Sequence, residues 1–225
     1  MKGITITIDG PAAAGKSSVA RQAAQALGYL YIDTGAMYRC LTYKLIRDGI
    51  DLDDEDAIQR VMQTTIIHIN NEKAYLDGVN VTEEIRSPHV TKEVSKVSAY
   101  PSVRLAMVEQ QREMAKYGSV ILDGRDTGSF VLPDAELKIF LTASIEARAK
   151  RRYKEMQRKQ NNTMTLEEVE RDLIRRDNYD STRLLAPLTV PHNALMVDTS
   201  TMTLHDAVNT IVEAARKVMR SHTND

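Results

Sequence analysis

The sequence predicts an α/β protein with a five-stranded, parallel, doubly wound sheet, a small inserted antiparallel β-sheet lobe and a short helical lid. Three observations support this class. Short apolar runs alternate with longer helix-forming segments, which is the pattern of a parallel sheet covered by helices. The first run leads directly into a glycine-rich loop of the kind that joins a strand to a helix at phosphate sites. A group of short β-like runs between residues 65 and 81 then interrupts the alternation.

The glycine-rich loop reads GPAAAGKSS and matches the phosphate-binding pattern G-x-x-x-x-G-K-[ST]. It follows an alternating run, Ile4 to Asp9, that predicts a strand, and precedes an alanine-rich segment that predicts a helix. Its glycines let successive N–H groups face an anion, and the helix adds its positive end. We expect Lys16 to reach the β- and γ-phosphates and Ser17 to ligate Mg²⁺ directly. A glycine turn that binds nothing is the alternative. The flanking strand and helix favour an ATP site made by Gly10, Pro11, Ala12, Ala13, Ala14, Gly15, Lys16, Ser17 and Ser18.

The composition excludes several classes of protein. The 225 residues are 42% hydrophobic, enough for the core of one sizeable α/β domain with an insertion. The 30 Lys and Arg nearly balance 31 Asp and Glu, and a net charge of −1 argues against a nucleic-acid partner. Cys40 is the single cysteine, so an intrachain disulfide is impossible. No segment resembles a secretory signal or is apolar enough to cross a bilayer, so we expect a cytoplasmic protein with no membrane partner. Separately, we expect a monomer.

The first half of the core follows from local signals. Gly28 is placed to end the first helix, and the apolar run at 29–32 predicts the second strand. A helix is expected from about residue 36 to residue 48, because Gly49 follows it. A more polar helix is expected at 53–64.

The next stretch predicts the inserted lobe. Asn-Asn-Glu and Asp-Gly turns separate the β-like runs, which indicates a small antiparallel sheet from residues 65–70, 73–76 and 79–81. Ser87 and Pro88 are expected to start one helix. Pro101 is expected to start a second, longer helix that ends at Gly118. We expect this lobe to move with an acceptor molecule. A purely structural insertion is the alternative for the hairpins.

The core then resumes. Apolar runs predict strands at 120–123, 137–141 and 194–198. Between the last two, we expect a long basic helix at 144–159, a polar loop at 160–164 and a second helix capped by Thr165 with Glu168. Thr203 and Asp206 cap the final helix. The chain is expected to form a single domain, with a core of about 1–40, 118–148 and 184–225, an insert of about 41–117 and a lid of about 149–183.

Charged residues mark the carboxyl ends of the strands, where ligands bind in such sheets. Asp9, Asp33, Asp123 and Asp198 each end a strand, so we expect them to surround one cleft. Asp33 and Asp123 are expected to hold Mg²⁺ through waters, because this ion keeps much of its own hydration. Either carboxylate could instead cap a helix.

Arginines occur in many separate loops, and their guanidinium groups, spread over the loops at the strand ends, can bind phosphate oxygens as planar forks. We expect them to surround a second anion that faces the triphosphate, from positions Arg39, Arg104, Arg125, Arg148, Arg151, Arg152, Arg175, Arg176 and Arg183. The basic run at 150–159 could be a solvated surface. We favour a lid over ATP, since Arg148, Arg151 and Arg152 share one helix face. Arg151 and Arg152 are the first candidates to stabilise the transferring phosphoryl group.

Five motifs in order complete the pattern: GPAAAGKSS, DTGAMYR, VSKVSAYP, DGRDTG and RRDNYDSTRLLAPL. Together they resemble the bacterial cytidylate kinase family from the first strand to the last helix. The chain departs from relatives at Ala12 and Ala13, where a Ser and a Gly are frequent, and we expect little effect because the loop binds through its N–H groups.

The resemblance implies a nucleoside monophosphate kinase core and transfer from ATP to CMP or dCMP with Mg²⁺. It implies that Arg39, Arg125 and Arg183 grip the CMP phosphate, that Arg176 and Asp180 hold the ribose, and that Ser95, Arg104 and Asp126 read the base. Thr34 joins these substrate-binding residues. The catalytic residues implied are Lys16, Arg125, Arg151 and Arg152.

Asp126 also suits cytosine on chemical grounds, because a carboxylate accepts a hydrogen bond from the 4-amino group and repels the 4-oxygen of uracil. An ion-pair partner that merely orients Arg125 is the alternative for this carboxylate. At the level of the whole chain, the alternatives are a kinase for UMP or a small hydroxylated metabolite, and a nucleotide-binding module without catalysis.

Overall fold

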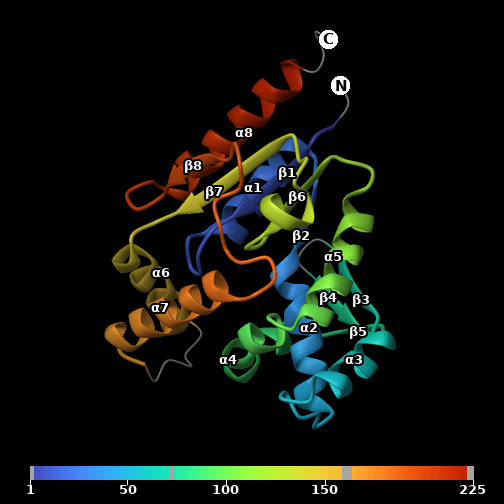
Figure 1. The fold of residues 1–225 in the computed structure, drawn as a ribbon. Coiled ribbons are helices and arrows are strands. Elements are labelled where there is room, and N and C mark those ends of the chain that lie inside the picture. Colours follow the sequence, from blue (N-terminus) through green and yellow to red (C-terminus); the bar gives the residue numbers. More distant parts are fainter. Residues whose placement is uncertain (1–2, 71–72, 159–163, 222–225) are drawn as a thin grey trace.

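A parallel sheet forms the centre of the computed structural model, which describes residues 3–70, 73–158 and 164–221 (Figure 1). The strand order is β2-β6-β1-β7-β8, and every neighbouring pair runs parallel. The strands are β1 (Thr5–Asp9), β2 (Leu30–Asp33), β6 (Val120–Asp123), β7 (Leu137–Thr142) and β8 (Leu195–Asp198). The predicted fold class is therefore confirmed.

Each face of this sheet has its own apolar core, because side chains alternate along a strand. Ile6, Ile8 and Ile121 pack on one face, where α1 (Lys16–Leu27) and α8 (Leu204–Ser221) contact each other. Val120 and Leu122 face the opposite way, against α5 (Pro101–Ala115) and a single π-helical turn, Thr127–Val131. The sequence analysis did not predict this turn.

The inserted lobe has a separate core. Helix α2 (Thr34–Arg47) packs there with Ile58, Leu76 and Val97. The other elements are α3 (Glu55–Gln63), the antiparallel strands β3 (Ile67–Asn70), β4 (Lys73–Leu76) and β5 (Val79–Asn80), a 3₁₀ turn (Glu84–Arg86) and α4 (Pro88–Val97). Because α2 belongs to this cluster, we propose that the insert begins with this helix instead of near residue 41.

Helices α6 (Ile145–Arg158) and α7 (Leu166–Thr182) pack against each other at the lower left of Figure 1. Their shared core includes Ala149, Leu173 and also Ala12 of the glycine-rich loop. The predicted capping box of Thr165 and Glu168 begins α7. Residues 71–72 of the first expected turn, and 159–163 of the expected basic helix and polar loop, lie outside the described residues.

Two predicted helix caps are confirmed. Gly28 ends α1 with a φ of 68°, and the Ser87 hydroxyl accepts a hydrogen bond from the Val90 N–H at the start of α4. Cys40 is buried and free. Within the described part of the chain, the structure contains no helix that could cross a membrane.

Candidate functional site

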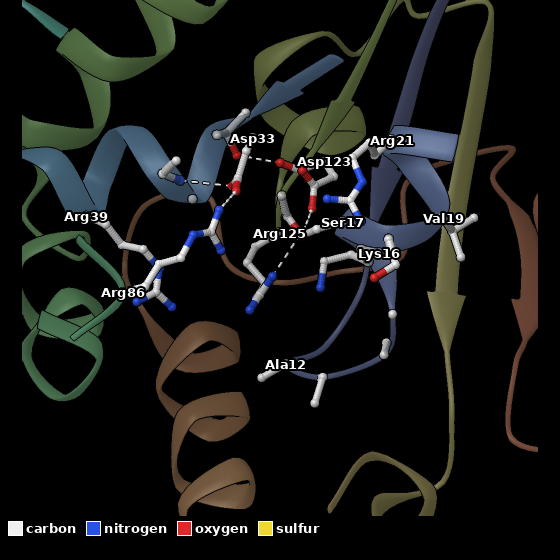
Figure 2. A pocket seen from close by; sticks show the side chains of 18 of the residues that line it. Ala12, Lys16, Ser17, Val19, Arg21, Asp33, Arg39, Arg86, Asp123 and Arg125 are labelled. Atoms are coloured by element: carbon white, nitrogen blue, oxygen red, sulfur yellow. Dashed lines mark hydrogen bonds and ion pairs between the residues drawn. The ribbon is translucent and has the colours of Figure 1, made fainter. Parts of the chain in front are cut away.

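A cavity of about 920 Å³ lies at the carboxyl ends of the central strands, between the glycine-rich loop, the insert and α6–α7. Its walls include most of the predicted site residues. The exceptions are Gly10 and Pro11 at the start of the loop, the strand-end carboxylates Asp9 and Asp198, and Arg148 and Arg175. Figure 2 shows Lys16 and Arg125 pointing into the same space from opposite sides. The cavity therefore brings together the two groups of residues that the sequence analysis assigned to two anions.

The loop between β1 and α1 has the backbone of an anion-binding turn. Gly10 has a φ of 148° and lies so close to β7 that a Cβ would meet the Leu141 carbonyl oxygen at 2.0 Å. Gly15 and Ala13 also have positive φ values, of 94° and 59°. Ala13 thus holds a left-handed conformation that favours glycine.

Lys16 is buried, and its Nζ donates to the Pro11 carbonyl oxygen at 2.7 Å. Burial and the neighbouring Arg125 lower the pKa of this ammonium group. A bound polyanion would favour the charged form, so the site is electrostatically suited to phosphate.

Asp123 lies at the centre of a polar network beside the loop. Its Oδ2 accepts from the Ser17 hydroxyl at 2.8 Å, and its Oδ1 accepts from the Tyr31 hydroxyl at 2.8 Å. Thr34 donates to its carbonyl oxygen at 2.7 Å. Asp33 occupies the paired position on β2. Burial and this second carboxylate raise the pKa of Asp123.

These groups fit a magnesium ion, because one hydroxyl and two neighbouring carboxylates supply the oxygen ligands that Mg²⁺ prefers. A cation there would also relieve the repulsion that raises the pKa of Asp123. Asp33 has the capping role considered above as well, since its Oδ1 accepts from the Ala36 N–H at 2.9 Å.

Asp9 and Asp198 do not face the cavity, so the expectation that all four strand-end carboxylates surround it is wrong for these two. Asp198 is exposed and accepts from Ser200. Asp9 is fully buried and accepts from the Thr127 N–H and hydroxyl, both at 2.8 Å, and from the Gly128 N–H at 2.7 Å. Burial raises the pKa of Asp9 to about 6. This carboxylate fixes the turn that follows Arg125 and Asp126.

Asp126 is held between two arginines. Arg183 donates to its Oδ1 at 3.1 Å, and Arg104 forms an ion pair with its Oδ2. Arg104 is only 1% exposed, also donates to the Ser98 carbonyl oxygen, and lies over the Tyr38 ring at 5.3 Å. The pairing of Asp126 with Arg125 that we considered is therefore not formed.

Arg125 pairs instead with Asp180, whose Oδ2 lies 2.8 Å from its Nε. Burial alone would lower the pKa of Arg125, but Asp180 outweighs it and raises this pKa. Conversely, Arg125 and Arg183 overcome the effect of burial and lower the pKa of Asp180. The guanidinium and the carboxylate both line the cavity, so each is oriented before a ligand arrives.

A cluster of arginines lies beside this pair with few protein partners. Arg39 donates to the Thr91 hydroxyl at 2.9 Å, and burial and Arg176 lower the pKa of Arg39 to about 9. The buried Nε of Arg176 has no hydrogen-bond partner in the structure. Arg86 lies next to Arg39 in Figure 2 and pairs weakly with Asp33, at 3.4 Å. Such a cluster is stabilised by an anion.

Arg86 was missed by the sequence analysis. It follows the inserted sheet in a short turn, Glu84–Arg86, and no motif or spacing distinguishes it from a surface arginine. Tyr38, Ser98 and Thr199 also line the cavity and were not singled out. Tyr38 could have been inferred, because it shares the segment DTGAMYR with Thr34 and Arg39.

The lid arginines divide into two groups. Arg151 and Arg152 line the cavity. Arg151 donates to the Ala14 carbonyl oxygen at 3.4 Å and to Thr199, and Arg152 donates to Glu155 at 3.0 Å.

Two other arginines do not face the second anion, contrary to expectation. Arg148 pairs with Asp177 behind the glycine-rich loop, and Arg175 pairs with Asp172 on the outer side of α7. Most of the remaining cavity arginines come from helices and not from strand-end loops, as Arg39, Arg104 and Arg176 show.

Comparison with known proteins shows which family the chain matches. The cytidylate kinase family model matches residues 6–217. A cytidylate kinase of Caldanaerobacter subterraneus is 47% identical over 95% of both chains, and one of Pediococcus pentosaceus is 48% identical over 92% of this chain and 93% of the relative. A solved gluconokinase from Sinorhizobium meliloti is 17% identical, with a TM-score of 0.50 over 100% of this chain and 98% of that one, which shows the fold alone. These matches agree with the phosphate-binding loop and the arginine cluster that faces it. The chain belongs to the cytidylate kinase family.

Proposed function

We propose that the chain transfers the γ-phosphoryl group of ATP to CMP or dCMP, giving CDP or dCDP and ADP. One observation carries the proposal: a single cavity holds the phosphate loop with Lys16 on one side and a cluster of arginines on the other. A kinase for a phosphorylated acceptor must bring two polyanions together and neutralise their repulsion. Family membership supports the same reaction.

The donor side would bind the triphosphate through the loop N–H groups and the start of α1. Lys16 would leave the Pro11 carbonyl oxygen for the phosphates, since an anion is the stronger partner of an ammonium group. Ser17, Asp33 and Asp123 would hold Mg²⁺, which would neutralise charge between the β- and γ-phosphates.

On the acceptor side, we assign the CMP phosphate to Arg39, Arg125 and Arg183. Burial of Arg39, and the Asp180 carboxylate that orients Arg125, prepare these groups for a phosphate oxygen. Arg176 and Asp180 would contact the ribose.

Asp126 would accept a hydrogen bond from the cytosine 4-amino group, with Ser95 and Arg104 beside it. Each carboxylate oxygen has two lone pairs, so Asp126 retains acceptor capacity while bound to two arginines. Its burial makes an unpaired uracil oxygen at this position costly.

Transfer itself would depend on positioning and electrostatic stabilisation, and we assign no side chain as a general base. Lys16, Arg125, Arg151 and Arg152 are the side chains we assign to the charge of the transferring group. One chain supplies both sides of the cavity, so we propose an active monomer, with no nucleic acid in the reaction. Because ATP and CMP are cytoplasmic metabolites, we place the activity in the cytoplasm.

The test is ADP release by the purified protein with CMP, dCMP, UMP and AMP, with Lys16→Ala as the control. We expect strong turnover with CMP and dCMP, weak turnover with UMP, and loss of turnover in the control. Preference for another acceptor would overturn the base assignment but keep the donor site. ATP binding without any acceptor would favour a binding module.

A further inference from the structure

Two lid residues that face away from the second anion hold one residue of the phosphate loop. The Ala12 N–H donates to Oδ1 of Asp177 on α7 at 2.9 Å. The Ala12 carbonyl oxygen accepts from Arg148 on α6 at 3.1 Å. Arg148 and Asp177 form an ion pair with each other, and Arg148 also donates to the Ala143 carbonyl oxygen at 3.1 Å. Both backbone groups of Ala12 are therefore bound by the lid.

These bonds orient two consecutive peptide groups of the loop in opposite senses. In a planar trans peptide the C=O and N–H point in opposite directions. The peptide between Pro11 and Ala12 directs its N–H to Asp177 and its C=O to Lys16. The next peptide directs its C=O to Arg148, which turns the Ala13 N–H to the opposite side.

A positive φ at Ala13 accompanies this reversal. Its value of 59° is unfavourable for a residue with a Cβ, so the loop needs external contacts to maintain it. One turn further along α6, Arg151 and Thr199 anchor the Ala14 carbonyl oxygen in the same way. Holding the Ala12 and Ala14 carbonyl oxygens outward turns the N–H groups of the same two peptides inward, as an anion site requires.

We propose that Arg148 and Asp177 are positioning residues that hold the phosphate loop in its anion-binding conformation, so that donor affinity depends on the docking of the lid helices. The proposal rests on the proposed function only in assigning this loop to the donor nucleotide. It assigns Arg148 to the donor side, and neither Arg148 nor Asp177 lines the cavity.

The charges of the pair give the proposal a specific signature. Asp177 is a carboxylate bound directly to a loop that receives a polyanion, and Arg148 compensates its charge. Removing Arg148 alone leaves an uncompensated negative charge beside the phosphates and frees the Ala12 carbonyl oxygen. Removing both charges avoids the repulsion, so the double variant should bind donor better than the variant at Arg148 alone.

The experiment compares Arg148→Met, Asp177→Asn and the double variant by calorimetric binding of Mg-ADP and, separately, of CMP. Arg175→Met and Asp172→Asn are matched controls, because these two residues form a more exposed ion pair on the same helix as Asp177. Thermal unfolding of each variant separates loss of folding from loss of binding. If Arg148→Met does not fold, Arg148→Lys replaces it. Lys can pair with Asp177 through its single nitrogen, whereas Arg148 uses Nε for the Ala143 oxygen and a terminal nitrogen for Ala12 and Asp177.

We expect Arg148→Met to weaken Mg-ADP binding about tenfold or more, as the loss of a charge-assisted hydrogen bond implies. CMP affinity should change by less than about threefold, and the control variants should match the wild type. Ala13→Gly added to Arg148→Met should recover part of the lost affinity, because glycine accepts the left-handed conformation without external support.

Equal losses of Mg-ADP and CMP affinity, or Mg-ADP affinity unchanged in Arg148→Met and Arg148→Lys, would overturn the proposal. These outcomes are distinct from failure of the proposed function, in which the wild-type protein would bind Mg-ADP but would not phosphorylate CMP.

Discussion

Asp126→Asn separates the two roles that the buried carboxylate could have. Asparagine keeps one oxygen, which can still accept from Arg183, but it presents an NH₂ group where Asp126 accepts from Arg104. Arg104 is 1% exposed and would retain the Ser98 carbonyl oxygen as its hydrogen-bond acceptor. Breaking a buried ion pair costs about 3–5 kcal/mol, and one retained bond reduces this to about 2–4 kcal/mol of folding stability.

The effect on the substrate is independent of that loss. The amide NH₂ cannot accept from the cytosine 4-amino group but can donate to the 4-oxygen of uracil. A lost hydrogen bond to a buried reading group costs about 1–3 kcal/mol, so the ratio of kcat/KM for CMP over UMP should fall about ten- to a hundredfold.

The assay measures kcat/KM for both acceptors at saturating ATP, at a temperature well below the midpoint of thermal unfolding of the variant. Asp172→Asn, on the outer side of α7, is the control for a charge change that should leave the ratio alone. Equal losses for CMP and UMP would refute base reading by Asp126 and leave it as a structural partner of Arg104.

Three further predictions concern stability and protonation. Because burial raises the pKa of Asp9 to about 6 from 3.8, the native state binds more protons than the unfolded chain between these values, and stability falls as the pH rises through this range. Asp9→Asn removes that slope, so urea unfolding should show wild type losing about 2 kcal/mol relative to the variant from pH 4 to 6, and parallel profiles would contradict this. Burial and Arg125 lower the pKa of Lys16, so binding of ADP without Mg²⁺ at pH 8 should be accompanied by proton uptake at this residue. The calorimetric binding enthalpy should therefore depend on the buffer in the wild type but not in Lys16→Met. Thr165→Ala removes the capping box of α7 and should lower the free energy of unfolding by about 1 kcal/mol, and an unchanged value would mean that the cap is dispensable.

Features set by a few neighbouring residues could be predicted from the sequence. The phosphate loop, the Thr165 capping box and the Ser87 cap before Pro88 all lie where local patterns placed them. In each, the interacting groups are within a few residues of one another, so spacing alone determines which groups can meet.

Long-range pairing could not be predicted in this way. Asp126 meets Arg104 and Arg183 across separations of 22 and 57 residues, and only the packing of α5 and α7 on the core brings them together. Sequence reasoning missed Arg86, which lines the cavity but belongs to no motif. It also assigned Arg148 to the cavity because of its helix face, whereas Arg148 lies behind the loop and pairs with Asp177.

Asp9 shows a third limit. Alternation along β1 puts Ile4, Ile6 and Ile8 on the face that packs against α1 and α8, which leaves Asp9 on the opposite face. The sequence gives no sign of what covers that face. The structure places there the turn Thr127–Val131, whose N–H groups bind the carboxylate and hold it away from the cavity.

The most direct test of the central claim follows the label from γ-³²P-ATP in the presence of CMP and Mg²⁺. The account predicts that the label appears in CDP, at a rate that depends on Lys16. Label released as inorganic phosphate, or retained in ATP while both nucleotides bind, would contradict the claim that the facing charged groups of this cavity transfer a phosphoryl group between two nucleotides.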